Sequence, residues 1–145
     1  FLILKLPRST LCLASRFATA ATNAIVLLSV RMPSTARAQA KSAAWIKTGI
    51  AFEIPEGYAG LIWDKSSVAH KWNITKIGGV FDSGYRGDIT VGLFNLGDES
   101  HLFKAGDKIA QIIFTPAPLC DLVESETLSE SVRGEKRFGS SGLRI

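Results

Sequence analysis

One carboxylate, Asp82, stands in the most informative stretch of the chain, GGVFDSGYRGDITVGLFN at residues 78–95. It lies between an apolar residue and the turn-forming pair Ser83-Gly84, and the aromatic ring of Tyr85 follows at once. Aspartate is a poor strand residue, so an aspartate at a strand end, beside an aromatic ring and a glycine turn, is often present for chemistry. The other interpretation is an aspartate that caps the turn of a β-hairpin. The residues alone leave both interpretations open.

The elements that would position this carboxylate are short strands. Aliphatic residues recur at every second position, Ile89, Val91 and Leu93, in alternation with Thr90, Gly92 and Phe94, which is the two-residue period of a half-buried strand. Gly, Pro and Asp turns recur at roughly ten-residue spacing. We expect strands over 48–54, 58–63, 89–95, 101–103 and 109–114, a polar break at 64–67 and a mixed connection over 68–76. This pattern predicts an all-β barrel or sandwich.

Length and composition predict one globular domain. The chain has 145 residues, of which 46% are hydrophobic and 21% charged, which is enough to build a core. No apolar run approaches the ~20 residues that a membrane-spanning helix needs. Cys12 and Cys120 form no metal-binding or redox spacing, so we expect two buried free thiols. His70 and His101 lack a ligand pattern around them, so no metal site is predicted from protein ligands.

Charge divides the chain near residue 47. Residues 1–52 hold seven basic residues and no acidic one, whereas all 13 acidic residues lie in 53–145. The segment 1–46 is therefore anomalous for a globular protein. An organelle transit peptide is rich in Arg and Ser and poor in acids, which fits this segment. A secretory signal fits less well because it needs a longer apolar stretch near a methionine start.

The C-terminal segment 125–145 has few large apolar residues and should be a mobile tail. It contains Arg133-Gly134 and then the string Phe138-Gly139-Ser140-Ser141-Gly142. Glycines that flank hydroxyl residues expose backbone N–H groups to an anion. An arginine can add a forked, charged contact to a phosphate, and a phenylalanine offers a flat face to a base. A solvated C-terminus without function is the alternative.

Four stretches of the chain together resemble the trimeric dUTPase family (deoxyuridine triphosphate nucleotidohydrolases). They are DKSS at 64–67, GGVFDSGYRGDI at 78–89, GDKIAQ at 106–111 and RGEKRFGSSG at 133–142. Each alone is weak, but they follow one another in the family's order and at family-like spacing. The resemblance covers about residues 47–142. It implies an all-β, dUTPase-like distorted β-barrel or jelly roll, with a β-domain over 47–124 and a mobile C-terminal arm over 125–145.

The resemblance implies hydrolysis of dUTP to dUMP and pyrophosphate, with Mg²⁺ held mainly by the triphosphate and water. Asp82 matches the carboxylate that orients and deprotonates the attacking water, and Tyr85 matches the ring that packs against the deoxyribose. The backbone of residues 79–81 would read the uracil edge, and the tail would close over the nucleotide. The implied substrate-binding residues are Lys65, Ser66, Ser67, Gly79, Val80, Phe81, Tyr85, Gln111, Arg133, Phe138, Gly139, Ser140 and Ser141.

The resemblance also implies a homotrimer whose subunits share each active site, with the tail reaching over a neighbouring subunit. We expect a cytoplasmic protein, with organellar targeting by residues 1–46 left open. The basic residues of the first third are scattered rather than clustered with aromatic residues, so no nucleic-acid partner is predicted, and no membrane partner is predicted either.

The chain departs from the family pattern in its second, fifth and first motifs. Arg137 stands in the fifth motif at a position that is commonly Gly. Lys65 stands where the second motif usually has Arg, and Trp63-Asp64 replaces the usual proline context. The first motif, Ala-Gly-x-Asp-Leu, is absent, and residues 1–46 contain no Asp. Lys5-Leu6-Pro7 nevertheless resembles the family's opening, and the distance from there to Lys47 is about right. We therefore hypothesise a disrupted reading frame over roughly residues 8–46.

Two other functions fit the same fold. One is a non-catalytic nucleotide-binding member that lost turnover together with the first motif. The other is a dCTP deaminase, because the pair Ser66-Ser67 is similar to that branch of the fold. The deaminase interpretation fits less well, since Gly92 stands where the deaminase has a catalytic Glu.

Overall fold

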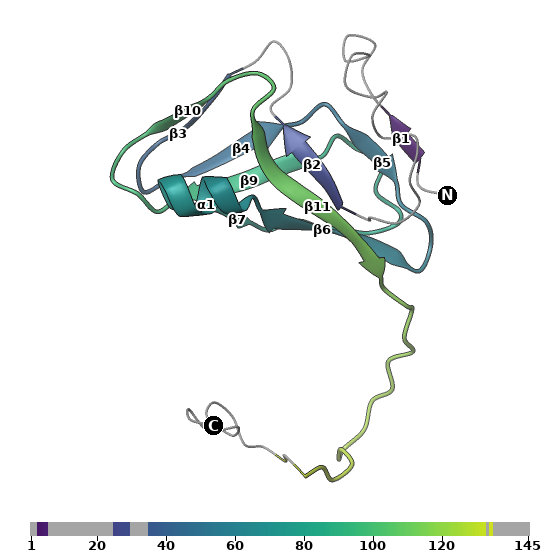
Figure 1. The fold of residues 1–145 in the computed structure, drawn as a ribbon. Helices are drawn as coiled ribbons and strands as arrows, with labels where there is room; N and C mark the ends of the chain where they lie inside the picture. The colour runs from purple at the N-terminus through teal and green to yellow at the C-terminus, as the bar shows by residue number, and fades with distance from the viewer. Residues whose placement is uncertain (1–2, 6–24, 30–34, 133, 135–145) are drawn as a thin grey trace.

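The protein consists of short β-strands and one helix, as a computed structural model of residues 3–5, 25–29, 35–132 and 134 shows (Figure 1). The all-β class expected from the sequence is confirmed. The strands are β1 (Ile3–Lys5), β2 (Ile25–Ser29), β3 (Ala36–Ala38), β4 (Ala43–Lys47), β5 (Ala51–Glu53), β6 (Tyr58–Asp64), β7 (Ile74–Ile77), β8 (Val80–Phe81), β9 (Thr90–Asn95), β10 (His101–Phe103) and β11 (Lys108–Pro116). The helix is α1 (Ser66–Trp72).

The described strands form two main sheets and two small ones, with antiparallel pairing throughout. The larger sheet has the order β2-β11-β6-β8, and the second has the order β4-β9-β7. β10 pairs with β3, and β1 pairs with β5. Figure 1 shows β11 running across the body between β2 and β6, with α1 at one edge beside β7. This arrangement leaves β7 and β8 at sheet edges, and Asp82 directly follows β8.

The core lies between the inner faces of the two main sheets. Ile62 and Ile112 come from the larger sheet, and Val91 and Leu93 come from the second. Each such aliphatic side chain contributes about 1.5–3 kcal/mol when it is fully buried. Among the residues that the structure describes, fifteen hydrophobic ones are buried: Leu28, Ala38, Ile46, Phe52, Ile54, Ile62, Val68, Ile74, Ile89, Val91, Leu93, Phe103, Ile109, Ala110 and Ile112. These core residues come from most of the elements, so the strands around the candidate site pack against one shared core.

The expected mixed connection over 68–76 is in fact helix α1 followed by strand β7. The helix ends at Asn73, whose left-handed backbone (φ 53°) lets its N–H donate to the carbonyl of Ala69. Val68 is the one buried residue of α1, so a helical apolar stripe is nearly missing from its sequence. Tertiary packing rather than local pattern decides this element.

The expected strand over 48–54 is shorter than predicted. β4 ends at Lys47, Thr48-Gly49 makes a turn with Gly49 at φ 71°, and the chain resumes as β5. The buried hydroxyl of Thr48 donates to the carbonyl of Ile89 (2.7 Å). Glycine adopts a positive φ without strain, so Gly49 allows the chain to turn here and the strand to break.

Parts of the anomalous segment 1–46 pair with the rest of the body. β2 pairs with β11, β3 with β10 and β4 with β9. Strands β3 and β4 are rich in alanine, which hides the two-residue hydrophobic alternation from sequence reading. The expected boundary at residue 46 falls inside β4. The disrupted reading frame stays a prediction.

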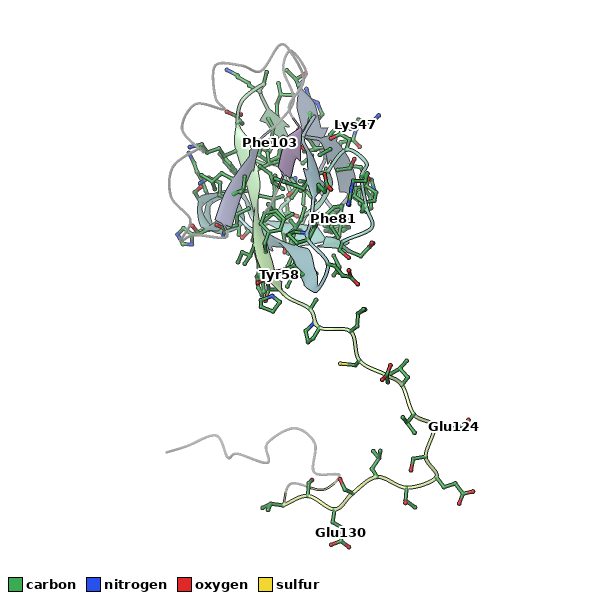
Figure 2. The ribbon with its side chains drawn as sticks, turned by 90° about the vertical axis from the view of Figure 1, so that its right-hand side faces the viewer. Lys47, Tyr58, Phe81, Phe103, Glu124 and Glu130 are labelled. Carbon is green, nitrogen blue, oxygen red and sulfur yellow. The ribbon has the colours of Figure 1, made fainter. Side chains whose placement is uncertain are left out.

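The chain after β11 extends away from the body as an exposed segment up to residue 132. Figure 2 shows Glu124 and Glu130 on this extension, far from Phe81 and Phe103 in the body. Cys120 lies on the extension and is exposed, so its expected burial is wrong, because nothing in the body packs over this stretch. Among the described residues, no helix combines the length and apolar character needed to cross a membrane.

Candidate functional site

Asp82 begins a tight turn directly after β8. The backbone N–H of Gly84 donates to Asp82 Oδ1 (2.8 Å), and the N–H of Tyr85 donates to the Asp82 carbonyl (3.3 Å). Aspartate commonly stabilises turns in this way, so the turn-capping interpretation is correct as far as it goes. The side chain is nevertheless exposed. A carboxylate has about four acceptor sites, and this turn uses one oxygen, so Asp82 keeps the capacity to bind a water molecule.

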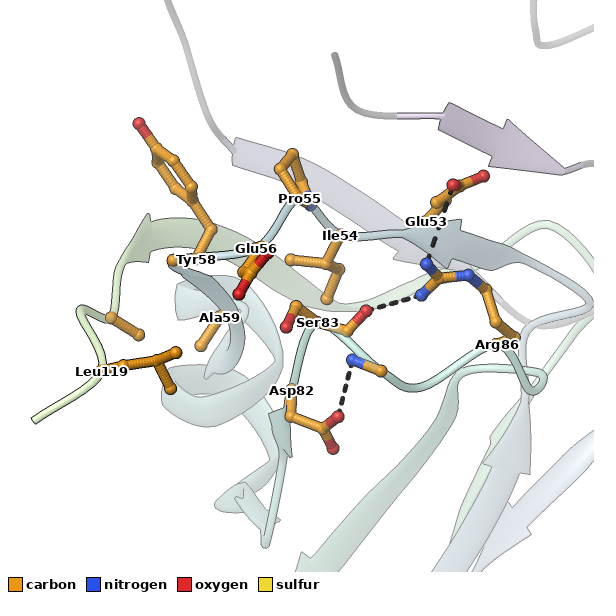
Figure 3. A pocket seen from close by; sticks show the side chains of 13 residues that line it. Glu53, Ile54, Pro55, Glu56, Tyr58, Ala59, Asp82, Ser83, Arg86 and Leu119 are labelled. Carbon is orange, nitrogen blue, oxygen red and sulfur yellow. Dashed lines mark hydrogen bonds and ion pairs between the residues drawn. The ribbon is translucent and has the colours of Figure 1, made fainter. Parts of the chain in front are cut away.

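Arg86 braces the same turn from outside (Figure 3). Its Nη1 donates to the carbonyls of Ser83 (2.6 Å) and Tyr85 (3.1 Å). Its Nη2 lies 3.7 Å from Glu53 Oε1 on β5. Both ends of the ion pair are about half exposed, so its net contribution to stability is small. The Arg86 side chain matters more for the geometry of the turn, since its guanidinium holds two carbonyls of the turn in place.

Tyr85 stands beside Asp82 with its ring held on both sides. Its hydroxyl donates to the carbonyl of Asp88 (3.0 Å), and its ring centroid lies 5.4 Å from that of Phe81. A Cβ atom at Gly87 would overlap the Tyr85 ring, so a larger residue there would displace the ring. The ring therefore has one defined position next to the carboxylate, and 38% of the residue remains exposed.

β8 offers free backbone groups beside the turn. It is the edge strand of its sheet, and its register pairs Phe81 with Gly60 and Val80 with Leu61. The carbonyl of Gly79 accepts from the N–H of Ile62 (2.8 Å). Because backbone groups of successive strand residues point to opposite sides, the N–H and C=O of Val80 face away from β6. Of the three residues expected to read a base, Val80 therefore has its backbone groups free to do so.

A close contact with β6 explains why position 79 is a glycine. Gly79 has φ 103°, and a Cβ there would lie 2.7 Å from Ile62 Cβ. Any larger residue would push β8 away from β6 and move the turn at Asp82.

The other predicted site residues gather at the opposite end of β6. Lys65 directly precedes α1, and its Nζ donates to the Ser67 hydroxyl. Ser66 and Ser67 are exposed in the first turn of the helix. Gln111 Nε2 donates to the carbonyl of Asp64 (3.0 Å). The fold thus brings together a lysine, two hydroxyls and an amide from stretches more than 40 residues apart, a set suited to bind anions.

These two groups of residues lie apart within one chain. A pocket of about 520 Å³ is lined by Asp82, together with Glu53, Glu56 and Arg86. A second pocket, of about 360 Å³, contains Lys65 and Ser67, and the two pockets share no lining residue. Asp82 follows the residue paired with Gly60, and at about 3.3 Å per residue the strand from Gly60 to Lys65 spans roughly 16 Å. One chain alone does not bring the carboxylate to the anion-binding groups.

The position that would carry a deaminase carboxylate is closed. Gly92 is buried under the exposed ring of Trp45. A Cβ at this position would lie 2.7 Å from Trp45 Cζ3 and 2.8 Å from the carbonyl oxygen of Ile77. The backbone contact cannot relax cheaply, so a glutamate at position 92 does not fit this structure.

An aromatic cluster beside the second pocket escaped the sequence analysis. The rings of Trp72 and His101 are stacked at 3.8 Å, and Phe103 lies edge-on to His101 at 4.6 Å. Burial lowers the pKa of His101 below its ordinary value of 6.5, opposed by the nearby Asp107 carboxylate and reinforced by Lys71. No local sequence motif predicts this cluster, because its members come from two separate elements, α1 and β10. The sequence analysis also did not place Glu53 and Glu56 beside Asp82, because they come from β5 and the turn that follows it.

The predicted arm residues Arg133, Phe138, Gly139, Ser140 and Ser141 lie outside the described residues. Within the described part of the chain, no group of three or more His, Cys, Asp or Glu side chains could hold a metal ion.

A protein-family model described as dUTPase matches residues 17–142. The chain belongs to the dUTPase family. It is 41% identical over 99 residues to the deoxyuridine 5'-triphosphate nucleotidohydrolase of Beijerinckia indica, covering 67% of this chain and 62% of that protein. It is 45% identical over 101 residues to the enzyme of the same name from Tropheryma whipplei strain Twist, covering 67% and 68%. The matched stretch thus spans about two thirds of the length of these relatives.

Solved dUTPase structures share the fold over nearly the whole chain. The dUTPase of Staphylococcus bacteriophage 80alpha with dUpNHpp superimposes with a TM-score of 0.76 at 28% identity, covering 99% of both chains. The family assignment expected from four motifs is therefore confirmed.

Proposed function

We propose that this protein is a dUTP diphosphatase, which hydrolyses dUTP to dUMP and pyrophosphate. The observation that carries the proposal is the exposed carboxylate of Asp82, fixed by the Gly84 N–H beside the ordered ring of Tyr85. The family assignment and the relatives named deoxyuridine 5'-triphosphate nucleotidohydrolase support it.

Asp82 is the proposed general base. It accepts a proton from a water molecule as the water oxygen bonds to the α-phosphorus, and the bond from that phosphorus to the α,β-bridging oxygen breaks. Pyrophosphate is then the leaving group, and dUMP is the other product. A positioned base of this kind supplies about 10²–10⁴-fold in rate.

Selection of the nucleotide falls to the hairpin around Asp82. The Tyr85 ring packs against the deoxyribose and leaves no room for a 2′-hydroxyl. The outward-facing N–H and C=O of Val80 offer one donor and one acceptor to the uracil edge. Gly79 and Phe81 hold this backbone against β6.

The phosphates bind at the other end of β6, against Lys65, Ser66, Ser67 and Gln111. The arm residues Arg133, Phe138, Gly139, Ser140 and Ser141 complete the proposed site, with Phe138 stacking on the uracil and Arg133 contacting the γ-phosphate. Closure of such an arm excludes water at the cost of ordering the chain.

Mg²⁺ is the proposed cofactor, carried by the triphosphate. The described residues lack a cluster of carboxylates for it, and Mg²⁺ commonly keeps several waters and binds through substrate phosphates. When bound, the ion would offset negative charge on the triphosphate.

A homotrimer with shared sites is the proposed assembly, and the separation of the two residue groups supports the sharing of sites between copies. A neighbouring copy can supply the phosphate-binding end that a single chain leaves about 16 Å along β6 from its own carboxylate. Apolar side chains left uncovered support an assembly of this kind. Trp45 is 65% exposed on the outer face of the second sheet, and Leu119, Leu122 and Leu128 on the extension are at least 86% exposed.

The proposal is tested by measuring pyrophosphate release from dUTP, dCTP and UTP with Mg²⁺ present. We expect turnover of dUTP alone, because Tyr85 rejects the 2′-hydroxyl of UTP and the Val80 backbone distinguishes uracil from cytosine. Binding of dUTP without pyrophosphate release would instead establish the non-catalytic member, which the missing first motif favours. Release of ammonia from dCTP would establish a deaminase.

A further inference from the structure

Asp64, the last residue of β6, accepts hydrogen bonds from two other strands. The backbone N–H of Lys76 donates to its Oδ1 (2.6 Å), and the hydroxyl of Thr75 donates to its Oδ2 (2.9 Å). Its own carbonyl accepts from Gln111 Nε2 (3.0 Å). One residue therefore ties β6 to β7 through its side chain and to the Gln111 side chain of β11 through its backbone.

The side-chain contacts of Asp64 lie where the two main sheets meet. β7 is the edge strand of the second sheet, so its outward N–H groups have no strand partner on that side. The carboxylate of Asp64 satisfies one of them, at Lys76. Hydrogen bonds to a charged acceptor are about twice as strong as neutral ones, and this pair is partly buried. The junction between β6 and α1 is thereby fixed in position.

The orientation of the Gln111 amide depends on this junction. A carbonyl oxygen only accepts, so the Asp64 carbonyl requires the NH₂ group of Gln111 on its side. The second N–H of that group remains available for another acceptor. A shift of Asp64 would move this donor and, through the chain, the adjoining Lys65.

We propose that Asp64 is a positioning residue for the phosphate-binding end of the site. The inference rests on the proposed dUTP diphosphatase function. The second motif of the family usually has proline at this place, and proline fixes its own backbone angle. In this chain a carboxylate fixes the same point by hydrogen bonds to β7, and it orients Lys65, Ser66, Ser67 and Gln111 without touching the substrate.

The test compares Asp64→Ala with Asp64→Asn. Asparagine keeps both contacts, because its Oδ1 accepts from Lys76 and its NH₂ donates to the Thr75 hydroxyl, which rotates to accept. Alanine keeps neither. We expect Asp64→Ala to raise KM for dUTP and Kd for dUpNHpp by roughly tenfold or more, the size of one lost hydrogen bond to a charged group. Asp64→Asn should remain within about threefold of the parent.

The binding of deoxyuridine is the matched control, because it uses the hairpin and no phosphate contact. Its Kd should stay unchanged in Asp64→Ala, and Thr75→Val, which removes one of the two contacts, should give an intermediate loss for dUpNHpp. Assays run well below the melting temperature of each variant. Equal losses for deoxyuridine and dUpNHpp, or a dUpNHpp affinity that Asp64→Ala leaves unchanged, would overturn the inference.

The dUpNHpp and deoxyuridine measurements do not depend on turnover. A parent protein that binds dUpNHpp but does not hydrolyse dUTP would refute the enzyme assignment, while the two affinities would still decide the role of Asp64. A parent protein that binds no dUpNHpp would overturn both.

Discussion

Asp82 combines two tasks that usually belong to different residues. One oxygen accepts from Gly84 and fixes the turn, while the exposed carboxylate keeps acceptor sites for water. The Arg86 guanidinium holds the carbonyls on either side of Gly84. The carboxylate therefore has a defined direction even without substrate, which lowers the cost of organising a general base.

The change Asp82→Asn isolates the chemical task of this residue. The Asn amide oxygen still accepts from Gly84, so the turn and the affinity for dUpNHpp should persist within about threefold. The rate should fall by about 10²–10⁴-fold, because an amide cannot take the proton. Single-turnover kinetics and dUpNHpp titration measure the two quantities.

Asp98→Asn is the matched control for the loss of one charge. Asp98 is 90% exposed and pairs with the surface residue Lys41, and its replacement should leave the rate unchanged. A near-parental rate for Asp82→Asn would remove Asp82 from the role of base.

At the scale of elements, we expect the contact between α1 and β10 to be sensitive to pH. His101 is stacked on Trp72, and burial keeps its pKa below 6.5. The folded state therefore binds fewer protons than the unfolded state as the pH falls below 6.5. The stabilisation by neutral His101 is present above that pH and is lost as the pH falls through the lowered pKa.

The change His101→Phe tests this contact, because a phenyl ring keeps the stack and cannot take a proton. Melting temperatures measured from about pH 7 down to pH 5 should fall more steeply for the parent than for His101→Phe. Parallel curves would show that carboxylates elsewhere, rather than His101, set the acid sensitivity.

At the scale of the whole molecule, the separated residue groups make assembly part of the proposed catalysis. The assembled protein should have a mass of about three times the 15.6 kDa of one chain. Light scattering after size-exclusion chromatography measures this mass. A strictly monomeric protein with full activity would contradict the shared site.

Mixing two impaired variants tests the sharing of sites directly. Asp82→Asn lacks the proposed base, and Gln111→Ala lacks a proposed phosphate contact. If each site takes its hairpin from one subunit and its phosphate end from another, about a quarter of the sites in randomly mixed trimers carry neither change. Co-expressed variants should therefore regain about a quarter of the parental rate. Activity no greater than the sum of the separate variants would place both groups in one chain.

Contiguous sequence was enough to predict the all-β class, the strands β6, β9, β10 and β11, and the turn at Asp82. Each of these depends on neighbours in the chain, such as the alternation over 90–95 or the adjacent pair Ser83-Gly84. Four ordered motifs were likewise enough to indicate the family, since motifs are local strings.

Only the tertiary structure decided which distant residues meet. The bonds from Thr75 and Gln111 to Asp64, the ring of Trp45 over Gly92 and the stack of His101 on Trp72 all join separate elements. Strand register sets these contacts, and a shift of one residue would turn every side chain to the other face. The chain's local chemistry therefore determined its candidate base. Packing determined what holds the proposed phosphate-binding end in place, and it also determined that one chain keeps this end apart from the candidate base.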